Sequence, residues 1–237
     1  NTGRADAAAE VARLLLENDP LEHWAANELA LAYRQMGRSG EASAALDSLS
    51  YRLRDSFQSY LELAADYGGC GLWDEGVAVL ERSLAMYGTF AGYNALGVSN
   101  ALSLTDGSKA MAYYYLGYGH NMLGNKTQAT DFYQQASSQP TTLVFPFRLE
   151  SIMVLGQAIA ARPNDPLPSY YLGNLLYDHQ PQRALALWEQ AAELGGDFST
   201  LHRNIALGYS RVKKDQKQAI ASLERAHELE PGDAQIL

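Results

Sequence analysis

The sequence has little cysteine and little lysine. The single cysteine, Cys70, excludes a disulfide within the chain and a zinc site built from several cysteines, so we expect a reducing, cytoplasmic location, with export left open. Only five residues are lysines, and the formal net charge of −9 opposes sequence-independent nucleic-acid binding, which requires cations to neutralise phosphates. No apolar run approaches the roughly 18 residues of a membrane-spanning helix. We therefore expect neither a nucleic-acid nor a membrane partner.

β-Branched residues are also sparse, whereas Ala, Leu, Glu, Gln and Arg dominate. This composition favours helices nearly throughout. The eight prolines and twenty glycines fall mostly where elements are expected to end, and 47% hydrophobic content is enough for a continuous core. The composition therefore predicts an all-α protein.

A pattern of small and large residues recurs along the chain. The first copy comprises Leu29, Ala30, Tyr33, Gly37, Ala42, Leu46 and Leu49. The second follows 34 residues later as Leu63, Ala64, Tyr67, Gly71, Gly76, Leu80 and Ser83. The third comprises Leu116, Gly117, His120, Gly124, Ala129, Tyr133 and Ala136. The fourth, one residue short at its turn, comprises Leu172, Gly173, Leu176, Ala184, Trp188 and Ala191. The fifth, one residue long at its turn, comprises Ile205, Ala206, Tyr209, Ala219, Leu223 and Ala226.

In this pattern the small residues mark where two helices of a hairpin cross closely, and the large residues fill the space around the crossing. The Gly in mid-repeat ends the first helix. Over roughly residues 21 to 232 the pattern resembles the tetratricopeptide-repeat family. The resemblance implies a right-handed superhelical solenoid of antiparallel helix pairs, in which each pair buries its apolar faces against its neighbours.

Two stretches fit the repeat poorly. Residues 88–106 occupy the place of a first helix without its order of small and large residues. Residues 147–161 resemble a second helix, but the extended TTLVFP stands where its partner should be, so we expect an irregular seam at 140–147. On this basis we divide the array into residues 1–143 and residues 144–237, as two parts of one continuous solenoid.

The second half carries the strings FPFRLE (145–150), RPNDPLPSYYLGNLLYD (162–178), LWEQA (187–191) and LHRNIALGY (201–209). They resemble the tetratricopeptide region of large bacterial proteins that also carry a β-rich domain of unknown function. This resemblance implies that the 237 residues are part of a longer polypeptide. It also suggests an accessory role in a carbohydrate-active protein, docking a catalytic domain or helping to bind sugar.

In tetratricopeptide arrays the first helix of each pair lines the concave surface, which implies where ligand contacts lie. In the first repeat this rule selects Trp24, Asn27, Arg34 and Gln35. In the later repeats it selects Tyr114, Tyr118, Asn121, Tyr170, Asn174, Tyr177, Asp178, Arg203 and Arg211. We add Arg148, because an irregular insertion is a common source of groove specificity.

Each of these assignments has a structural alternative. Tyrosines at such spacings also pack between hairpins, and Arg148 also fits a helix start at which it pairs with Glu150. Asn174 and Asn204 match two positions of the clamp by which some family members hold a carboxylate, but Tyr170 stands at the lysine position. We therefore expect Asn204 to bond to the backbone instead.

No catalytic constellation, cofactor motif or metal motif is present, because the five histidines form no pair three or four residues apart. The leading hypothesis is a non-enzymatic scaffold that binds a protein or peptide segment, including another domain of its own polypeptide. The carbohydrate-linked accessory role is the alternative. A homodimer remains open as well, because the short tail after Pro231 provides little cover for the end of the array.

Overall fold

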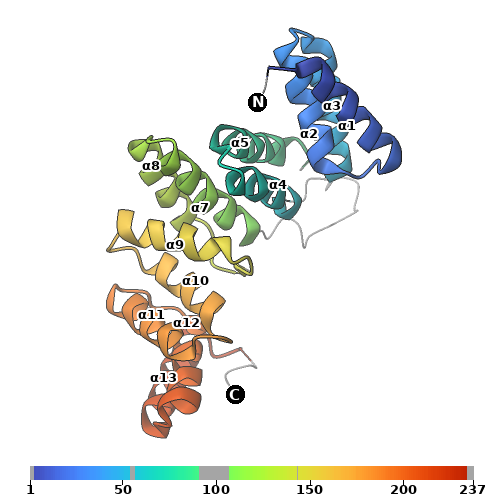
Figure 1. Ribbon diagram of the computed structural model, residues 1–237. Coiled ribbons are helices and arrows are strands. Elements are labelled where there is room, and N and C mark those ends of the chain that lie inside the picture. The colour runs from blue at the N-terminus through green and yellow to red at the C-terminus, as the bar shows by residue number, and fades with distance from the viewer. Residues whose placement is uncertain (1–2, 54–56, 91–106, 143, 234–237) are drawn as a thin grey trace. The chain divides into compact units, whose positions relative to one another are not determined.

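A computed structural model describes residues 3–53, 57–90, 107–142 and 144–233. The chain forms two compact units, residues 1–103 and residues 104–237, drawn in blue to teal and in green to red in Figure 1. Among the described residues every regular element is helical. The predicted all-α fold of tetratricopeptide-like helix pairs is therefore confirmed.

The first unit contains five described helices. They are α1 (Ala5–Asn18), α2 (His23–Gln35), α3 (Ser39–Leu53), α4 (Phe57–Gly69) and α5 (Trp73–Phe90). Consecutive helices pack as α1 on α2, α2 on α3, and α4 on α5. α1 lies before the first recognised repeat and buries Ala9 and Ala12 against its neighbour. The two predicted repeats of this unit are thus the hairpins α2–α3 and α4–α5.

The second unit contains the remaining described helices. They are α7 (Gly107–Met122), α8 (Lys126–Ser137), α9 (Glu150–Ala161), α10 (Pro166–Leu176), α11 (Pro181–Glu193), α12 (Ser199–Gly208) and α13 (Gln216–Leu229). The pairs α7–α8, α10–α11 and α12–α13 pack most extensively, and they are the third, fourth and fifth repeats. α11 also packs against α12, which joins neighbouring hairpins.

The turns inside the first three hairpins are set by glycine. Gly37, Gly71 and Gly124 have φ angles of 73°, 76° and 81°, in the left-handed region where a side chain is strained. Each follows the first helix of its pair. The predicted role of the mid-repeat glycine is therefore confirmed in these three hairpins.

The small positions lie at helix crossings, as predicted. Ala30, Ala64 and Ala206 are at most 5% exposed. At Gly117 an added Cβ would stand 2.4 Å from the ring of Tyr133, and at Gly173 an added Cβ would stand 2.5 Å from Nε1 of Trp188. In the third and fourth hairpins the large residue of the second helix therefore packs directly on the small residue of the first.

The fifth hairpin accommodates its extra residue in a π-helical turn, Tyr209–Lys213, which continues α12. Lys214 then takes the left-handed conformation, with φ of 58°, that glycine supplies in the first three hairpins. The side chain of Asp215 accepts a hydrogen bond from the backbone N–H of Gln218 and caps α13. The extra residue therefore lengthens the turn between α12 and α13 and leaves α13 itself regular.

The described residues between α8 and α9 are not helical, and they include most of the segment at 140–147 where we predicted a seam. This segment and the predicted division at 143/144 both fall inside the second compact unit. α9 packs mainly against α7 and α10, which are the first helices of their pairs. It therefore covers first helices instead of completing a hairpin as a second helix. Of the other poorly fitting stretch, 88–106, the first three residues belong to α5, and residues 91–106 lie outside the described residues.

Candidate binding surface

Two of the predicted contact residues, Tyr114 and Tyr170, are buried between helices. Tyr114 is fully buried, its hydroxyl lies 3.1 Å from Oγ of Ser137, and burial raises its pKa well above the ordinary value. Tyr170 is 6% exposed and donates a hydrogen bond of 3.2 Å to Oγ1 of Thr200. These two tyrosines follow the structural alternative, because they pack between helices with almost no surface for a ligand.

Asn174 is the centre of a polar network that joins three helices. Its Oδ1 accepts hydrogen bonds from Nε1 of Trp188 on α11 at 3.0 Å and from Nδ2 of Asn204 on α12 at 2.9 Å. Since the indole N–H can only donate, the Asn174 oxygen must face Trp188, and this fixes the orientation of both amides. Asn204 therefore bonds to a side chain, and our expectation of a backbone partner was wrong.

This arrangement leaves polar groups pointing away from the network. Both hydrogens on Nδ2 of Asn174 and the Oδ1 of Asn204 have no hydrogen-bond partner among the described residues. Nδ2 of Asn174 and Oδ1 of Asn204 are not fully buried, so both atoms are accessible at the surface. α10 and α12 thus present an amide donor and an amide acceptor from two residues that are themselves hydrogen-bonded.

Further candidates lie on α12 or in the turns that follow α10 and α12. Tyr177 is half-buried, with its ring centroid 5.2 Å from that of Trp188, and Asp178 is exposed. Tyr177 is the C-terminal cap of α10, and Asp178 lies in the turn that follows the helix. Arg203 is half-buried and 4.0 Å from Asp233, whereas Arg211 is exposed in the π-helical turn.

The α7 candidates have different neighbours. Tyr118 is half-buried, and Nδ2 of Asn121 donates a long hydrogen bond of 3.4 Å to Gln157 of α9. Arg148 lies just before α9, where its Nε is 3.5 Å from a carboxylate oxygen of Glu150. This geometry agrees with the structural alternative for Arg148. α9, which the sequence did not place here, therefore contacts the α7 candidates.

In the first unit the predicted groove residues form an internal network. Asn27 is fully buried and donates a hydrogen bond of 2.9 Å to the hydroxyl of Tyr67, which in turn donates to Glu28 at 2.7 Å. Trp24 stacks on the Tyr67 ring with 4.1 Å between centroids. Burial is the main cause of the raised pKa of Tyr67. These contacts hold α2 against α4.

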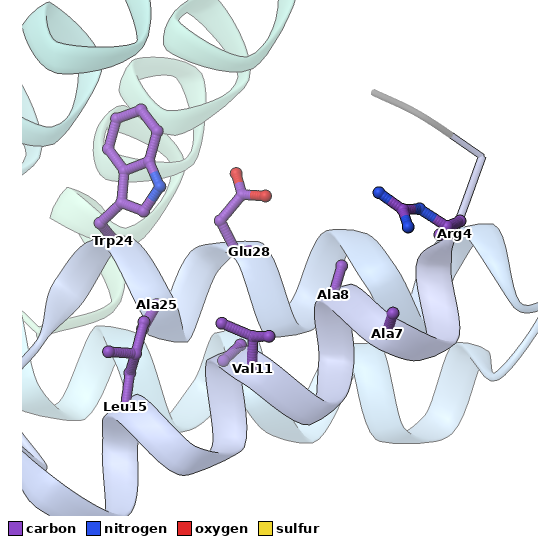
Figure 2. Close-up of a pocket in the computed structure, with 9 residues that line it drawn as sticks. Arg4, Ala7, Ala8, Val11, Leu15, Trp24, Ala25 and Glu28 are labelled. Carbon is purple, nitrogen blue, oxygen red and sulfur yellow. The ribbon is translucent and has the colours of Figure 1, made fainter.

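A groove between α1 and α2 was not found by sequence reasoning. It has a volume of about 500 Å³ and is lined by apolar side chains together with Arg4 and Glu28. Figure 2 shows Ala7, Val11 and Leu15 along α1, with Arg4 at its start. α1 carries no repeat signature, and only the pattern of its outward apolar residues could have indicated this surface.

The part of the chain that the structure describes contains no group of three or more His, Cys, Asp or Glu side chains placed to hold a metal ion. Within the same residues, no helix is long and apolar enough to cross a membrane. The surface at α10 and α12 instead offers amides, a phenol, a carboxylate and guanidinium groups. These groups form hydrogen bonds and ion pairs with a ligand.

No model of a known protein family matches the sequence, and no curated protein does so either. The chain resembles several solved structures. One is MamA, with 20% identity over 87% of this chain and 97% of that chain, and a TM-score of 0.35. Another is YrrB, described as a TPR protein with an unusual peptide-binding site, with 16% identity over 96% of each chain and a TM-score of 0.36. PilF of Pseudomonas aeruginosa has 13% identity over 98% of this chain and 94% of that chain, and a TM-score of 0.35. At these TM-scores the similarities locate no binding site in the present chain.

Proposed function

We propose that the chain is a non-enzymatic scaffold that binds an extended protein or peptide segment along α10 and α12. The observation that supports this function is the pair of amides at Asn174 and Asn204. A hydrogen bond joins the two amides, and the remaining N–H groups of Asn174 and the C=O of Asn204 match the C=O and N–H that a peptide backbone presents. Because backbone groups are common to all peptides, this pair binds a chain without reading its sequence.

Sequence preference then comes from the neighbouring side chains. Asp178 offers an exposed carboxylate in the turn that follows α10, four positions after Asn174, where it suits a basic side chain of the bound segment. Arg211 follows Asn204 by seven positions and is exposed, so it suits an acidic side chain. Tyr177 supplies apolar contact area and a hydroxyl beside them.

The test is a selection of linear 12-residue peptides from a phage-displayed library against the 237-residue chain. Selected peptides are then titrated by fluorescence anisotropy. We expect Asn204→Ala to weaken their binding at least tenfold, because it removes the outward acceptor and leaves the Trp188–Asn174 hydrogen bond in place. The matched control is Asn164→Ala, at an exposed amide in the turn between α9 and α10.

Equal losses in Asn204→Ala and Asn164→Ala, or no loss in either, would refute the proposed site. Thermal unfolding of both variants shows whether the fold is intact. A glycan array probed with the same proteins distinguishes the carbohydrate-linked alternative from the peptide-binding scaffold. Glycan binding that depends on Asn204, without peptide binding, would favour that alternative over the scaffold.

A further inference from the structure

The outward face of α1 is apolar and unpartnered among the described residues. Val11 is 56% exposed, Leu14 52% and Leu15 48%, which is unusual for three aliphatic side chains within two helical turns. The opposite face, with Ala9 and Ala12, is buried on α2. α1 is therefore apolar on both sides, and the described residues of the chain cover only one of them.

The residues of this outward stripe are ordered by size. Ala7 and Ala8 precede Val11 by four and three positions, and Leu14 and Leu15 follow it by three and four positions. The positions of the stripe are thus symmetric about Val11, but the side chains are small on its N-terminal side and large on its C-terminal side. A helix with this order is complementary to a copy of itself that runs antiparallel.

We propose that a second copy of this chain docks in the groove, with its α1 antiparallel to the first and Val11 on the two-fold axis. In this register Ala7 of each copy faces Leu15 of the other, and Ala8 faces Leu14. Each large side chain then enters the space left by a small one, which is the requirement for close helix packing. A two-fold axis makes both halves of the contact identical.

Charge is consistent with the same orientation. Arg4 stands at the N-terminal end of α1 and lines the groove, so in the antiparallel pair it lies beside the C-terminal turn of the other α1. That turn carries the negative end of the helix dipole and the exposed carboxylate of Glu17, and its own helix has no basic residue there. Trp24 and Glu28 of α2 form the second wall of the groove, as Figure 2 shows.

The size of the contact predicts its strength. The stripe from Arg4 to Asn18 is about 21 Å long at 1.5 Å per residue. A contact of one helix and its flanks is small against the roughly 1,200–2,000 Å² of a stable complex. We therefore expect a reversible dimer that forms at tens of micromolar protein, independently of peptide binding at α10 and α12.

Sedimentation velocity of the 237-residue chain between about 1 and 300 μM tests the proposal in the concentration range of weak complexes. We expect a concentration-dependent shift from monomer to dimer. Val11→Glu brings two like charges together on the axis and is expected to weaken the dimer at least tenfold. Ile220→Glu is the control, because it changes a side chain of similar exposure, 55%, on α13.

A size swap tests the register. Ala7→Leu alone places two large side chains opposite each other and is expected to weaken the dimer. The double variant Ala7→Leu/Leu15→Ala exchanges large and small and is expected to restore it. In a Cys70→Ser background, Val11→Cys is expected to form an interchain disulfide on mild oxidation, because the two thiols meet on the axis.

A monomer at every concentration would overturn the proposal. So would a dimer that is insensitive to Val11→Glu, one lost equally in Ile220→Glu, or one that the size swap fails to restore. Circular dichroism of each variant confirms that the helices are intact, and these exposed positions make unfolding of the monomer an unexpected result.

Discussion

Gly117→Ala adds one methyl group at a helix crossing that has no room for it. The new Cβ would lie 2.4 Å and 2.5 Å from two ring carbons of Tyr133 and 3.0 Å from the carbonyl oxygen of Ala129. Carbon atoms in good contact stand about 3.5–4.0 Å apart. The ring of Tyr133 is 1% exposed, so it has little space in which to move aside. α7 and α8 must therefore separate by on the order of 1 Å to restore normal contact.

The magnitude follows from two opposing effects. Overpacking a filled core costs about 1–3 kcal/mol, while replacing a helical glycine with alanine gains about 1 kcal/mol. Because both a buried ring and a backbone carbonyl obstruct the methyl group, we expect a cost near the upper end, and a net loss of about 1–2 kcal/mol. The control is Gly156→Ala in α9, where a Cβ meets nothing within 4 Å. There only the propensity gain remains, so the control should stabilise by about 0.5–1 kcal/mol.

Urea unfolding followed by circular dichroism at 222 nm measures both changes. Since the chain has two compact units, two transitions are fitted, and both variants should move the one that belongs to the second unit. Tyr133→Leu should remove most of the penalty, so that Gly117→Ala becomes neutral or favourable in that background. Equal shifts for Gly117→Ala and Gly156→Ala would refute the close crossing.

Two further predictions concern buried polar groups and pH. Tyr133→Phe should leave the free energy of unfolding unchanged or raise it, because the Tyr133 hydroxyl is buried without a hydrogen-bond partner among the described residues. Tyr67→Phe should lower the free energy of unfolding by about 1–3 kcal/mol, because it removes the acceptor of the Asn27 side chain. Hydrogen bonds, first from Arg225 and then from His202, lower the pKa of the Asp197 carboxyl below its ordinary value of 3.8. The ionised carboxylate therefore stabilises the fold fully above that ordinary value, and this stabilisation is lost as the pH falls through the lowered pKa. Acid titration of the unfolding free energy should be steeper for the native chain than for Asp197→Asn below about pH 5.

The repeat was predictable because its signal resides in residues that contact each other within one hairpin. The two residues of such a pair are sixteen positions apart for Gly117 and Tyr133, and fifteen for Gly173 and Trp188. The close crossing of the two helices requires the first residue to be small and leaves room for the second to be large. The position of α9 was not predictable in this way. Its apolar pattern specifies a buried helix but not which helices cover it, and its contacts with α7 arise only in the folded unit.

The candidate site was predicted less well than the fold. Sequence spacing placed Tyr114 and Tyr170 on the first-helix face, and they do lie on α7 and α10, but their rings turn inward against Tyr171 and Phe198. Helical periodicity gives the direction of a Cα–Cβ bond and not the rotamer of a long aromatic side chain. Asn174 lies on α10 as its spacing indicated, whereas its two hydrogen-bond donors could only be seen in the structure.

The π-helical turn at Tyr209–Lys213 bears on how such chains are recognised from their sequences. A search for a strict 34-residue spacing loses its alignment at this point, although the fifth hairpin is packed like the others, with Ala206 and Ala219 both at most 3% exposed. Insertions and deletions can therefore accumulate in these turns while the crossings stay intact. The third and fourth hairpins share the contact of one small and one large residue across two helices, although the number of residues between the two differs by one.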